Sequence, residues 1–287
     1  MSGFSLPGMT EPVTVLGLGP MGQAIAAAFA AGGHPTTVWT RSGRTGPAGT
    51  TRAADVEAAV TASKTVVVCL IDYAATRSVL EPAAGALRGR LVVNLTSGSP
   101  ASARATAGWA AQHDITYVDG AIMTPIDTIG TEHAVILHSG PNTDVLGALG
   151  GTRTHLGADH GRAAAYDVAL LDVFWTAVAG VTHAFALARR EGIAATELAP
   201  LAKGIADLMP IVIDEHSRAL ENGDHNGDEA NLSSAAAGMA HIVETATEHG
   251  IDAGVMRAAL AVARRAIDAG HGGDGLSRLT VTLEEGI

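Results

Sequence analysis

The sequence predicts an α/β protein with an N-terminal doubly wound parallel sheet, a long interdomain helix and a C-terminal domain made entirely of helices. Three observations support this fold class. Short β-branched runs alternate with alanine-rich helical stretches in the first half of the chain, which is typical of helices covering both faces of a parallel sheet. A glycine-rich turn joins the first such run to the first helical stretch. After Gly161 only helical spacing continues.

The composition restricts the class of protein. Of the 287 residues, 47% are hydrophobic and 16% are charged, as in globular proteins with substantial cores. The formal net charge is −11 and the basic residues do not cluster, so we do not expect binding to nucleic acid, whose phosphates need Lys and Arg. The single cysteine, Cys69, excludes an intrachain disulfide and is typical of the reducing cytoplasm. Its apolar neighbours place it in a strand and not in a nucleophilic site.

The expected strands are short, and several are continuous apolar runs like those of strands buried on both faces. Their ranges are Val13–Leu18, Thr36–Trp39, Thr65–Leu70, Leu91–Leu95, Thr116–Val118 and Ala134–Leu137. Helices are expected between most of them, at Met21–Ala31, Ala53–Ala62, Ala74–Leu87 and Ser102–Gln112. Right-handed crossovers through these helices make neighbouring strands parallel.

The second half is expected to begin with a helix over about 162–191, ended by Gly192. Its apolar part is long enough to span a bilayer, but Asp167, Asp172 and His183 inside it are costly in lipid. We therefore expect the buried central helix of a globular protein. Four further helices are expected near Glu197–Asn222, Leu232–His249, Val255–Ala269 and Leu276–Glu284. Pro210 predicts a kink or a break in the first of them.

The glycine-rich turn has the spacing of a dinucleotide site. The first strand runs directly into Gly17-Leu18-Gly19-Pro20-Met21-Gly22, and an alanine-rich helix follows, which is the strand–turn–helix context that such a site requires. Gly17 permits the tight turn, Gly19 admits the pyrophosphate to the backbone, and Gly22 lets helix and strand pack closely. The phosphates then lie at the helix N-terminus. We therefore expect a Rossmann-type domain.

The end of the second strand predicts which nucleotide binds. An NAD site has an acidic residue there for the ribose 2′-hydroxyl, whereas this chain has Thr40-Arg41-Ser42-Gly43-Arg44. Arg41 and Ser42 can bind a 2′-phosphate, and Arg44 adds positive charge. The alternative is that this stretch is a solvated loop that binds no nucleotide, but two arginines at one turn favour an NADPH site. Thr40, Cys69, Leu70 and Thr96 complete the expected cofactor contacts.

These features divide the chain into four parts. The expected boundaries are 1–11 for a flexible leader, 12–161 for the NADP-binding Rossmann domain, 162–192 for the interdomain helix, and 193–287 for a helical substrate and dimerisation domain.

The chain resembles a known superfamily. Its glycine motif, its helical second domain and the stretch Asn94–Pro100 resemble the β-hydroxyacid dehydrogenase superfamily, which carries a lysine six residues after a glycine as its general acid. Here Asp167 occupies that lysine position after Gly161. Together with this substitution, the stretches 121–123, 129–130, 167–171, 179–184 and 270–274 resemble imine reductases and reductive aminases, from about Pro12 onward.

The resemblance implies NADPH-dependent reduction of C=N bonds, of cyclic imines above all, with Asp167 facing the imine nitrogen. A carboxylate in a dry pocket stabilises an iminium cation, and a carboxyl whose pKa is raised by burial could also donate the proton. The alternative is that Asp167 interacts only with the helix dipole. Relatives with aspartate here tend to give (R)-amines, so the same preference is expected.

The remaining pocket residues also follow from the resemblance. Trp175 stands where relatives often have tyrosine, and because tryptophan is not an acid we expect it to shape the pocket. Ser97 replaces an asparagine of the reductive aminases, which disfavours coupling of free ketone and amine. Thr96, Ser97 and Met123 are expected to line the nicotinamide pocket. Weaker pocket candidates, for which core packing is the alternative, are Ile205, Leu208, Met209, Ser234 and Met239.

The sequence also bears on metal binding, on assembly and on alternative functions. The twelve histidines show no metal-binding spacing, so no metal is expected. The apolar central helix and the resemblance imply a domain-swapped homodimer with its active site in a cleft between subunits. A β-hydroxyacid or small-aldehyde dehydrogenase remains an alternative, although neither 96–100 nor 123–128 supplies an Arg or Lys to anchor such a substrate. The second alternative function is that of a non-catalytic NADPH-binding sensor.

Overall fold

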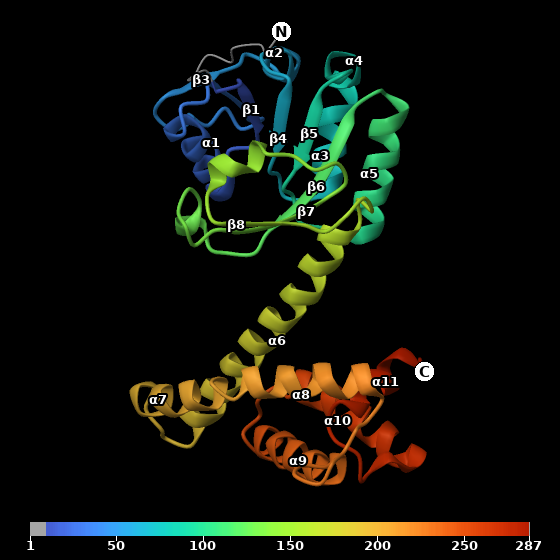
Figure 1. Ribbon diagram of the computed structural model, residues 1–287. Helices are drawn as coiled ribbons and strands as arrows, with labels where there is room; N and C mark the ends of the chain where they lie inside the picture. Colours follow the sequence, from blue (N-terminus) through green and yellow to red (C-terminus); the bar gives the residue numbers. More distant parts are fainter. Residues whose placement is uncertain (1–9, 287) are drawn as a thin grey trace. The chain divides into compact units, whose positions relative to one another are not determined.

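The computed structural model describes residues 10–286, and these fall into two compact units that divide between Asp172 and Val173. Most of the expected leader, 1–11, therefore lies outside the described residues. The first unit is built on an eight-stranded sheet (Figure 1) with the order β3-β2-β1-β4-β5-β6-β7-β8. The strands are β1 Val13–Leu16, β2 Thr36–Trp39, β3 Thr50–Arg52, β4 Thr65–Val68, β5 Leu91–Asn94, β6 Thr116–Ile122, β7 Val135–Ser139 and β8 Thr152–His155.

The sheet is mostly parallel. Strands β1 to β6 pair in parallel, as the alternation of strands and helices predicts. Strand β7 pairs antiparallel with β6, and β8 is parallel to β7, so the predicted parallel sheet contains one antiparallel pairing near this edge. The connection between β6 and β7 contains one short turn, η2 Ile126–Thr128.

Helices cover both faces of this sheet. They are α1 Pro20–Ala31, α2 Val56–Thr61, α3 Tyr73–Leu80, η1 Glu81–Ala83, α4 Ala84–Leu87 and α5 Pro100–Gln112, with the turn η3 Val145–Leu149 between β7 and β8. The single helix expected over 74–87 is broken at η1, whose second residue is Pro82. Proline cannot continue a hydrogen-bonded helix, because it has no backbone N–H. Asp72 caps α3 by accepting a 2.7 Å hydrogen bond from the Ala75 N–H.

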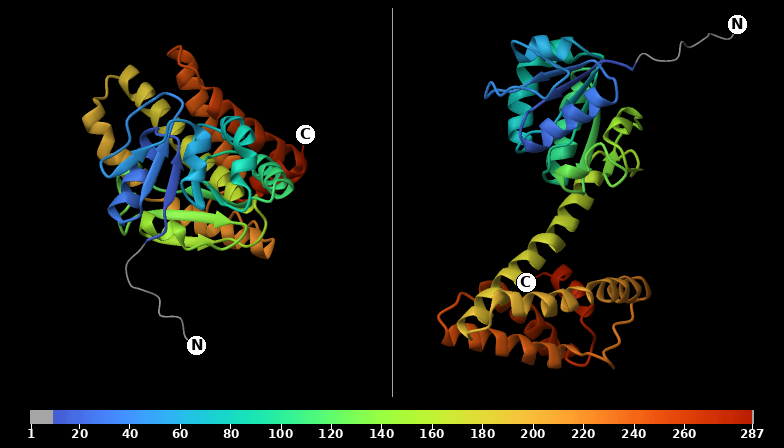
Figure 2. Two further views of the ribbon diagram at one scale, coloured as in Figure 1. Left: turned by 90° about the horizontal axis from the view of Figure 1, so that it is seen from above. Right: turned by 90° about the vertical axis from the view of Figure 1, so that its left-hand side faces the viewer.

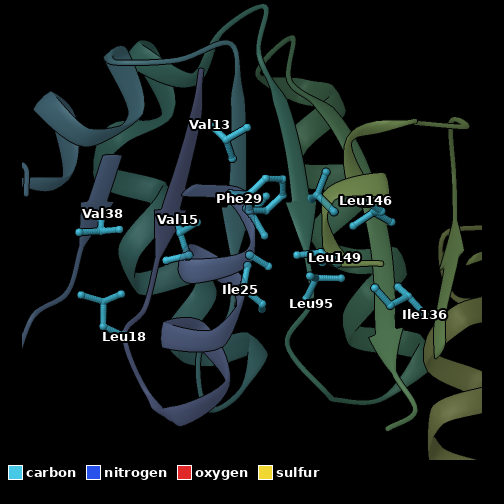
Figure 3. Packing of buried hydrophobic residues seen from close by; sticks show 14 of the residues in the cluster. Val13, Val15, Leu18, Ile25, Phe29, Val38, Leu95, Ile136, Leu146 and Leu149 are labelled. Atoms are coloured by element: carbon cyan, nitrogen blue, oxygen red, sulfur yellow. The ribbon is translucent and has the colours of Figure 1, made fainter. Parts of the chain in front are cut away.

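The core of the first unit forms two layers, one on each face of the sheet. Alternate residues of β1 point to opposite faces, so that Val13 and Val15 belong to one cluster and Leu16 to the other. In the first cluster, Ile25 and Phe29 of α1 pack onto the strands (Figure 3). These layers fix the carboxyl ends of the parallel strands, where the glycine-rich turn lies.

The long helix α6 covers Arg162–Arg190. It is the one helix of residues 10–286 that is long and apolar enough to cross a membrane, a test that core helices of soluble proteins also pass. Its only buried residues are Ala163, Ala164, Asp167 and Ala188. The expectation of a buried helix is therefore wrong for the chain by itself, because no element of the second unit covers the apolar side chains of its middle turns.

The second unit continues with helices alone, which Figure 2 shows from two further sides. They are α7 Ala195–Ala206, α8 Met209–Asn222, α9 Leu232–Glu248, α10 Gly254–Ala266, η4 Ile267–His271 and α11 Arg278–Glu284. The break expected at Pro210 is confirmed, since α7 ends before it and Pro210 lies in the first turn of α8, where its missing N–H has no helical partner to lose. The core of this unit forms where Ala236 of α9 packs against Leu260 and Ala263 of α10.

Candidate nucleotide and acid site

The turn between β1 and α1 is closed by glycine. Gly17 has φ of 103°, and a Cβ added there would lie 2.1 Å from the Cys69 carbonyl oxygen. A Cβ on Gly22 would lie 2.1 Å from the Gly17 carbonyl oxygen, whereas one on Gly19 would meet nothing within 4 Å. Gly17 and Gly22 therefore allow the strand, the turn and the helix to pack together, and Gly19 leaves backbone open to a ligand.

This turn forms one wall of a cleft of about 490 Å³. The lining residues are Gly17–Gly22, Trp39–Ser42, Cys69–Ile71, Ala75 and Val79. The structure thus brings all six residues of the glycine motif together with Thr40, Arg41, Ser42, Cys69 and Leu70. The N-terminus of α1 faces the cleft, which suits the phosphates of a dinucleotide.

The rim of the cleft holds the residues expected to select NADPH. The Arg41 guanidinium donates a 3.1 Å hydrogen bond to the Ser78 hydroxyl, and the hydroxyls of Thr40 and Ser42 lie 3.3 Å apart. No acidic residue lines the cleft in the described part of the chain. A cation and hydroxyls without a competing carboxylate fit the 2′-phosphate of NADPH better than the free 2′-hydroxyl of NADH.

Two residues of the expected cofactor set do not line the cleft. Arg44 donates a 3.0 Å hydrogen bond to the Leu18 carbonyl oxygen, so it braces the glycine turn. Thr96 is buried, and its hydroxyl accepts a 3.0 Å hydrogen bond from the Leu70 N–H. Both side chains therefore support the wall of the cleft through hydrogen bonds to Leu18 and Leu70 and do not line it.

Asp167 lies in the second turn of α6 and is only 2% exposed. Burial raises the pKa of its carboxyl, and a hydrogen bond from the Ser97 hydroxyl partly opposes that effect. Because the helix dipole acts mainly on the first turn, it does not account for a buried carboxyl at this position. The structure thus brings two of the predicted site residues, Asp167 and Ser97, together.

A hydroxyl holds the start of α6 on the sheet. The Ser139 hydroxyl at the end of β7 donates to the His160 carbonyl oxygen and accepts from the Ala163 N–H, each at 3.1 Å. His160 in turn has its Nε2 3.1 Å from the Tyr117 carbonyl oxygen. These bonds fix the turn of helix that precedes Asp167.

Sequence reasoning missed a buried acid in β6. The Asp119 carboxyl is fully buried and accepts hydrogen bonds from the phenols of Tyr73 and Tyr117, at 2.5 and 2.9 Å. Burial raises the pKa of Asp119 to about 6, the two phenols oppose this, and the charge of Asp167 adds to it. A polar residue inside the otherwise apolar run Tyr117-Val118-Asp119 is the pattern that could have drawn attention to it.

The remaining candidates lie apart from this cluster in the chain. Met123 follows β6 and is half-buried, and Trp175 is 61% exposed. Exposed side chains at the α7–α8 junction are Ile205, Leu208 and Met209. Ser234 is exposed in the first turn of α9, while Met239 packs into the core between α9 and α10, which is the alternative weighed for it.

Among residues 10–286 no three His, Cys, Asp or Glu side chains come together in a way that could hold a metal ion.

Comparisons with known proteins identify the family. A model described as the C-terminal domain of NADPH-dependent reductive aminase-like proteins matches residues 159–285, and the NAD-binding domain of 6-phosphogluconate dehydrogenase matches residues 12–140. An NADPH-dependent reductive aminase from Aspergillus oryzae is 30% identical, over 94% of this chain and 96% of that protein. The chain belongs to the imine reductase and reductive aminase family.

Solved structures of this family have the same fold. An imine reductase from Myxococcus stipitatus in complex with NADP+ is 36% identical and has a TM-score of 0.90, with 95% of this chain and 99% of that chain covered. A reductive aminase from Aspergillus terreus in complex with NADPH4, cyclohexanone and allyl amine is 33% identical, with a TM-score of 0.88 and coverage of 96% and 100%. The family and the fold class predicted from the sequence are confirmed.

Proposed function

We propose that this imine reductase family member reduces imines to amines with NADPH, and that Asp167 is the group facing the imine nitrogen. As a member of this family it is an oxidoreductase acting on C=N bonds. The observation that carries the role of Asp167 is its position: a buried carboxyl with a raised pKa, hydrogen-bonded by Ser97. A buried carboxyl exerts a strong field on a nearby cation because little water screens it.

The cofactor is held by the cleft beside the glycine turn. The free N–H groups at the start of α1 would bind its phosphates, and Arg41 with Ser42 would bind the 2′-phosphate. When bound, NADPH supplies the hydride that adds to the imine carbon. The fit rests on the open space at Gly19 and on the absence of an acidic residue from the described lining of the cleft.

Asp167 acts on the imine nitrogen, by charge stabilisation or by proton donation, while the imine carbon accepts hydride. In its ionised form it stabilises the positive charge of a protonated imine. In its protonated form it donates the proton that converts the nitrogen to an amine, and it becomes a carboxylate. The Ser97 hydroxyl holds the carboxyl by donating to it.

The choice of substrate follows from the other pocket residues. Trp175 cannot donate a proton at its position and instead presents a broad apolar surface, since it is 61% exposed. Ser97 in place of asparagine favours preformed imines over coupling of a free ketone and an amine. We propose small cyclic imines as substrates and (R)-amines as the main products. Met123, Ile205, Leu208, Met209, Ser234 and Met239 remain candidate pocket residues.

We further propose that the enzyme is a cytoplasmic homodimer, domain-swapped so that the substrate site is shared between the subunits. The support is the row of exposed apolar side chains in the middle of α6, which in water would expose a large apolar surface. Members of this row are Val173, Phe174, Trp175, Val178 and Val181. An active monomer in light scattering would contradict the dimer.

The test is NADPH oxidation with 2-methyl-1-pyrroline, comparing the wild-type protein with Asp167→Ala. We expect kcat to fall by ~100-fold or more, the scale for loss of a general acid or charge stabiliser. Glu57→Ala, which removes an exposed carboxylate of α2 in the first unit, serves as the matched control and should keep kcat within about twofold, as surface substitutions usually do. Tight NADPH binding without turnover would contradict the proposed function, and turnover that survives Asp167→Ala would contradict the role of Asp167.

A further inference from the structure

Tyr73 is a buried side chain that the proposed function leaves without a role. It is the first residue of α3 and directly follows Asp72, the cap of that helix. Only 7% of its surface is exposed. The residues just before the cap, Cys69–Ile71, form one wall of the nucleotide cleft. Tyr73 is therefore tied through a short stretch of chain to the expected cofactor.

The ring of Tyr73 packs against the loop that carries Ser97. A Cβ on Gly98 would lie 2.3 Å from Cδ2 and 2.6 Å from Cε2 of this ring, so the Gly98 backbone rests directly on it. The φ angle of Gly98 is not positive, so glycine is required here for space and not for its backbone conformation. Because Ser97 is the neighbouring residue, the ring restricts where Ser97 can lie.

The same ring packs against two helices. Tyr73 forms one buried cluster with Ala103 of α5 and Ala164 of α6. Both alanines have small side chains, so the tyrosine ring fills most of the space among these three segments. Ala164 precedes Asp167 by three residues, so the two share one face of α6. The place of the ring therefore affects the turn of helix that carries Asp167.

The phenol hydroxyl fixes the ring at its far end. It donates a 2.5 Å hydrogen bond to Oδ1 of Asp119, which also accepts a 2.9 Å hydrogen bond from the Tyr117 phenol. Burial raises the pKa of Tyr73, and the charge of Asp119 adds to this, so the phenol keeps its proton and remains a donor. Asp119 belongs to β6, which has a strand on each side. The sheet thus holds one end of the ring, and the loop and the two helices pack around it.

We propose that Tyr73 is a positioning residue for imine reduction: its ring holds the loop of Ser97 and the first turns of α6 in place, and so sets where Asp167 lies relative to the nucleotide cleft. This inference rests on the proposed role of Asp167. Hydride donor and acid act on two adjacent atoms, the carbon and the nitrogen of the imine, so their separation has to be exact to a fraction of an ångström. Displacement of Asp167 should lower kcat and leave NADPH affinity unchanged, because the glycine turn and Arg41 belong to other elements.

The first variant is Tyr73→Ala, which removes the ring. With 2-methyl-1-pyrroline, at a temperature well below thermal unfolding, kcat should fall by about tenfold or more, since a misplacement of 1 Å can cost ~100-fold. The Kd of NADPH should stay the same. Tyr73→Phe keeps the ring and should recover most of the lost kcat. Leu80→Ala is the control for stability: Leu80 is a fully buried residue of the same helix in a different cluster, so this variant should unfold at a lower temperature and keep its kcat.

The reciprocal variant is Gly98→Ala, which leaves Tyr73 in place and pushes the loop away from the ring. It should lower kcat as Tyr73→Ala does. When both substitutions are combined, the Cβ enters the space that the ring has left, so kcat should be no lower than in Tyr73→Ala alone; residues in contact are not additive. Gly108→Ala is the matched control, because a Cβ on this exposed glycine of α5 meets nothing within 4 Å. It should keep the wild-type kcat.

A second readout needs no imine. The full-length protein is labelled with 13C at the aspartate carboxyls and saturated with NADPH, and the resonance of Asp167 is the one missing from Asp167→Asn. Tyr73→Ala and Gly98→Ala should shift this resonance away from its wild-type position, because both displace the surroundings of Asp167. Leu80→Ala and Gly108→Ala should leave it where it is.

The outcomes separate this proposal from the proposed function. Wild-type kcat and an unshifted Asp167 resonance in Tyr73→Ala and Gly98→Ala would overturn it, as would an equal loss of kcat in Leu80→Ala. If Tyr73→Ala does not fold, Gly98→Ala decides the matter against Gly108→Ala. If the wild type does not reduce the imine, the proposed function fails, and the Asp167 resonance still shows whether Tyr73 positions that carboxyl.

Discussion

Replacing Arg41 by alanine tests the assignment of the cofactor. The guanidinium stands at the rim of the cleft beside Ser42 and is steadied by its hydrogen bond to Ser78. Hydrogen bonds to charged groups contribute about 1.5–3 kcal/mol. Because Arg41 is exposed, we take the lower end of this range. A loss of about 1.5 kcal/mol weakens binding roughly tenfold.

The assay is titration of the protein with NADPH and with NADH, followed by nicotinamide fluorescence. Arg41→Ala should raise the Kd of NADPH by about tenfold and change that of NADH little, since NADH has no 2′-phosphate. Arg88→Ala is the matched control, because Arg88 forms an exposed ion pair with Asp114 and does not line the cleft. A Kd of NADPH within twofold of wild type, or an equal loss for both nucleotides, would refute the reasoning.

Two further predictions concern the glycine turn and the buried acid. Gly22→Ala places a Cβ against the Gly17 carbonyl and should lower the free energy of unfolding by about 1–3 kcal/mol in urea. Gly19→Ala has open space around its Cβ, so it should keep the stability of the protein and weaken NADPH binding. A stable Gly22→Ala or a destabilised Gly19→Ala would contradict these roles. Folding raises the pKa of Asp119 from 3.8 to about 6, so the unfolded chain releases this proton at a lower pH than the folded protein does. The free energy of unfolding should therefore fall by about 2–3 kcal/mol as the pH rises from about 4 to 6. Comparison of urea unfolding with Asp119→Asn isolates this loss, and an identical pH dependence in both proteins would show that Asp119 is not its source.

The cofactor half of the site could be predicted because its determinants are local. The glycine motif acts within a single strand–turn–helix unit, and Arg41 follows the next strand directly. The direction of β7 could not be read from the sequence, since an apolar run does not encode which way it pairs. Strands β3 and β8 were missed because their residues are largely exposed and carry no alternating apolar pattern.

The buried acid escaped prediction for a different reason. Tyr73, Tyr117 and Asp119 meet through contacts between residues as many as 46 positions apart, and no spacing in the sequence encodes that meeting. The sequence predicted Asp167 through its position after Gly161, which depends on the resemblance to a family. Its burial and its neighbour Asp119 depend on how α6 is held on the sheet by Ser139.

The two ends of the strand order limit how copies of this chain can associate. A sheet edge offers unpaired backbone groups to a strand from another molecule, and proteins discourage such β-augmentation with short or charged edge strands. Strand β3 is three residues long and ends in an exposed arginine, and β8 is exposed throughout with Arg153 at its second position. Neither edge presents an apolar template. Pairing of strands between copies is therefore disfavoured at both edges, and this protects the protein from edge-to-edge aggregation.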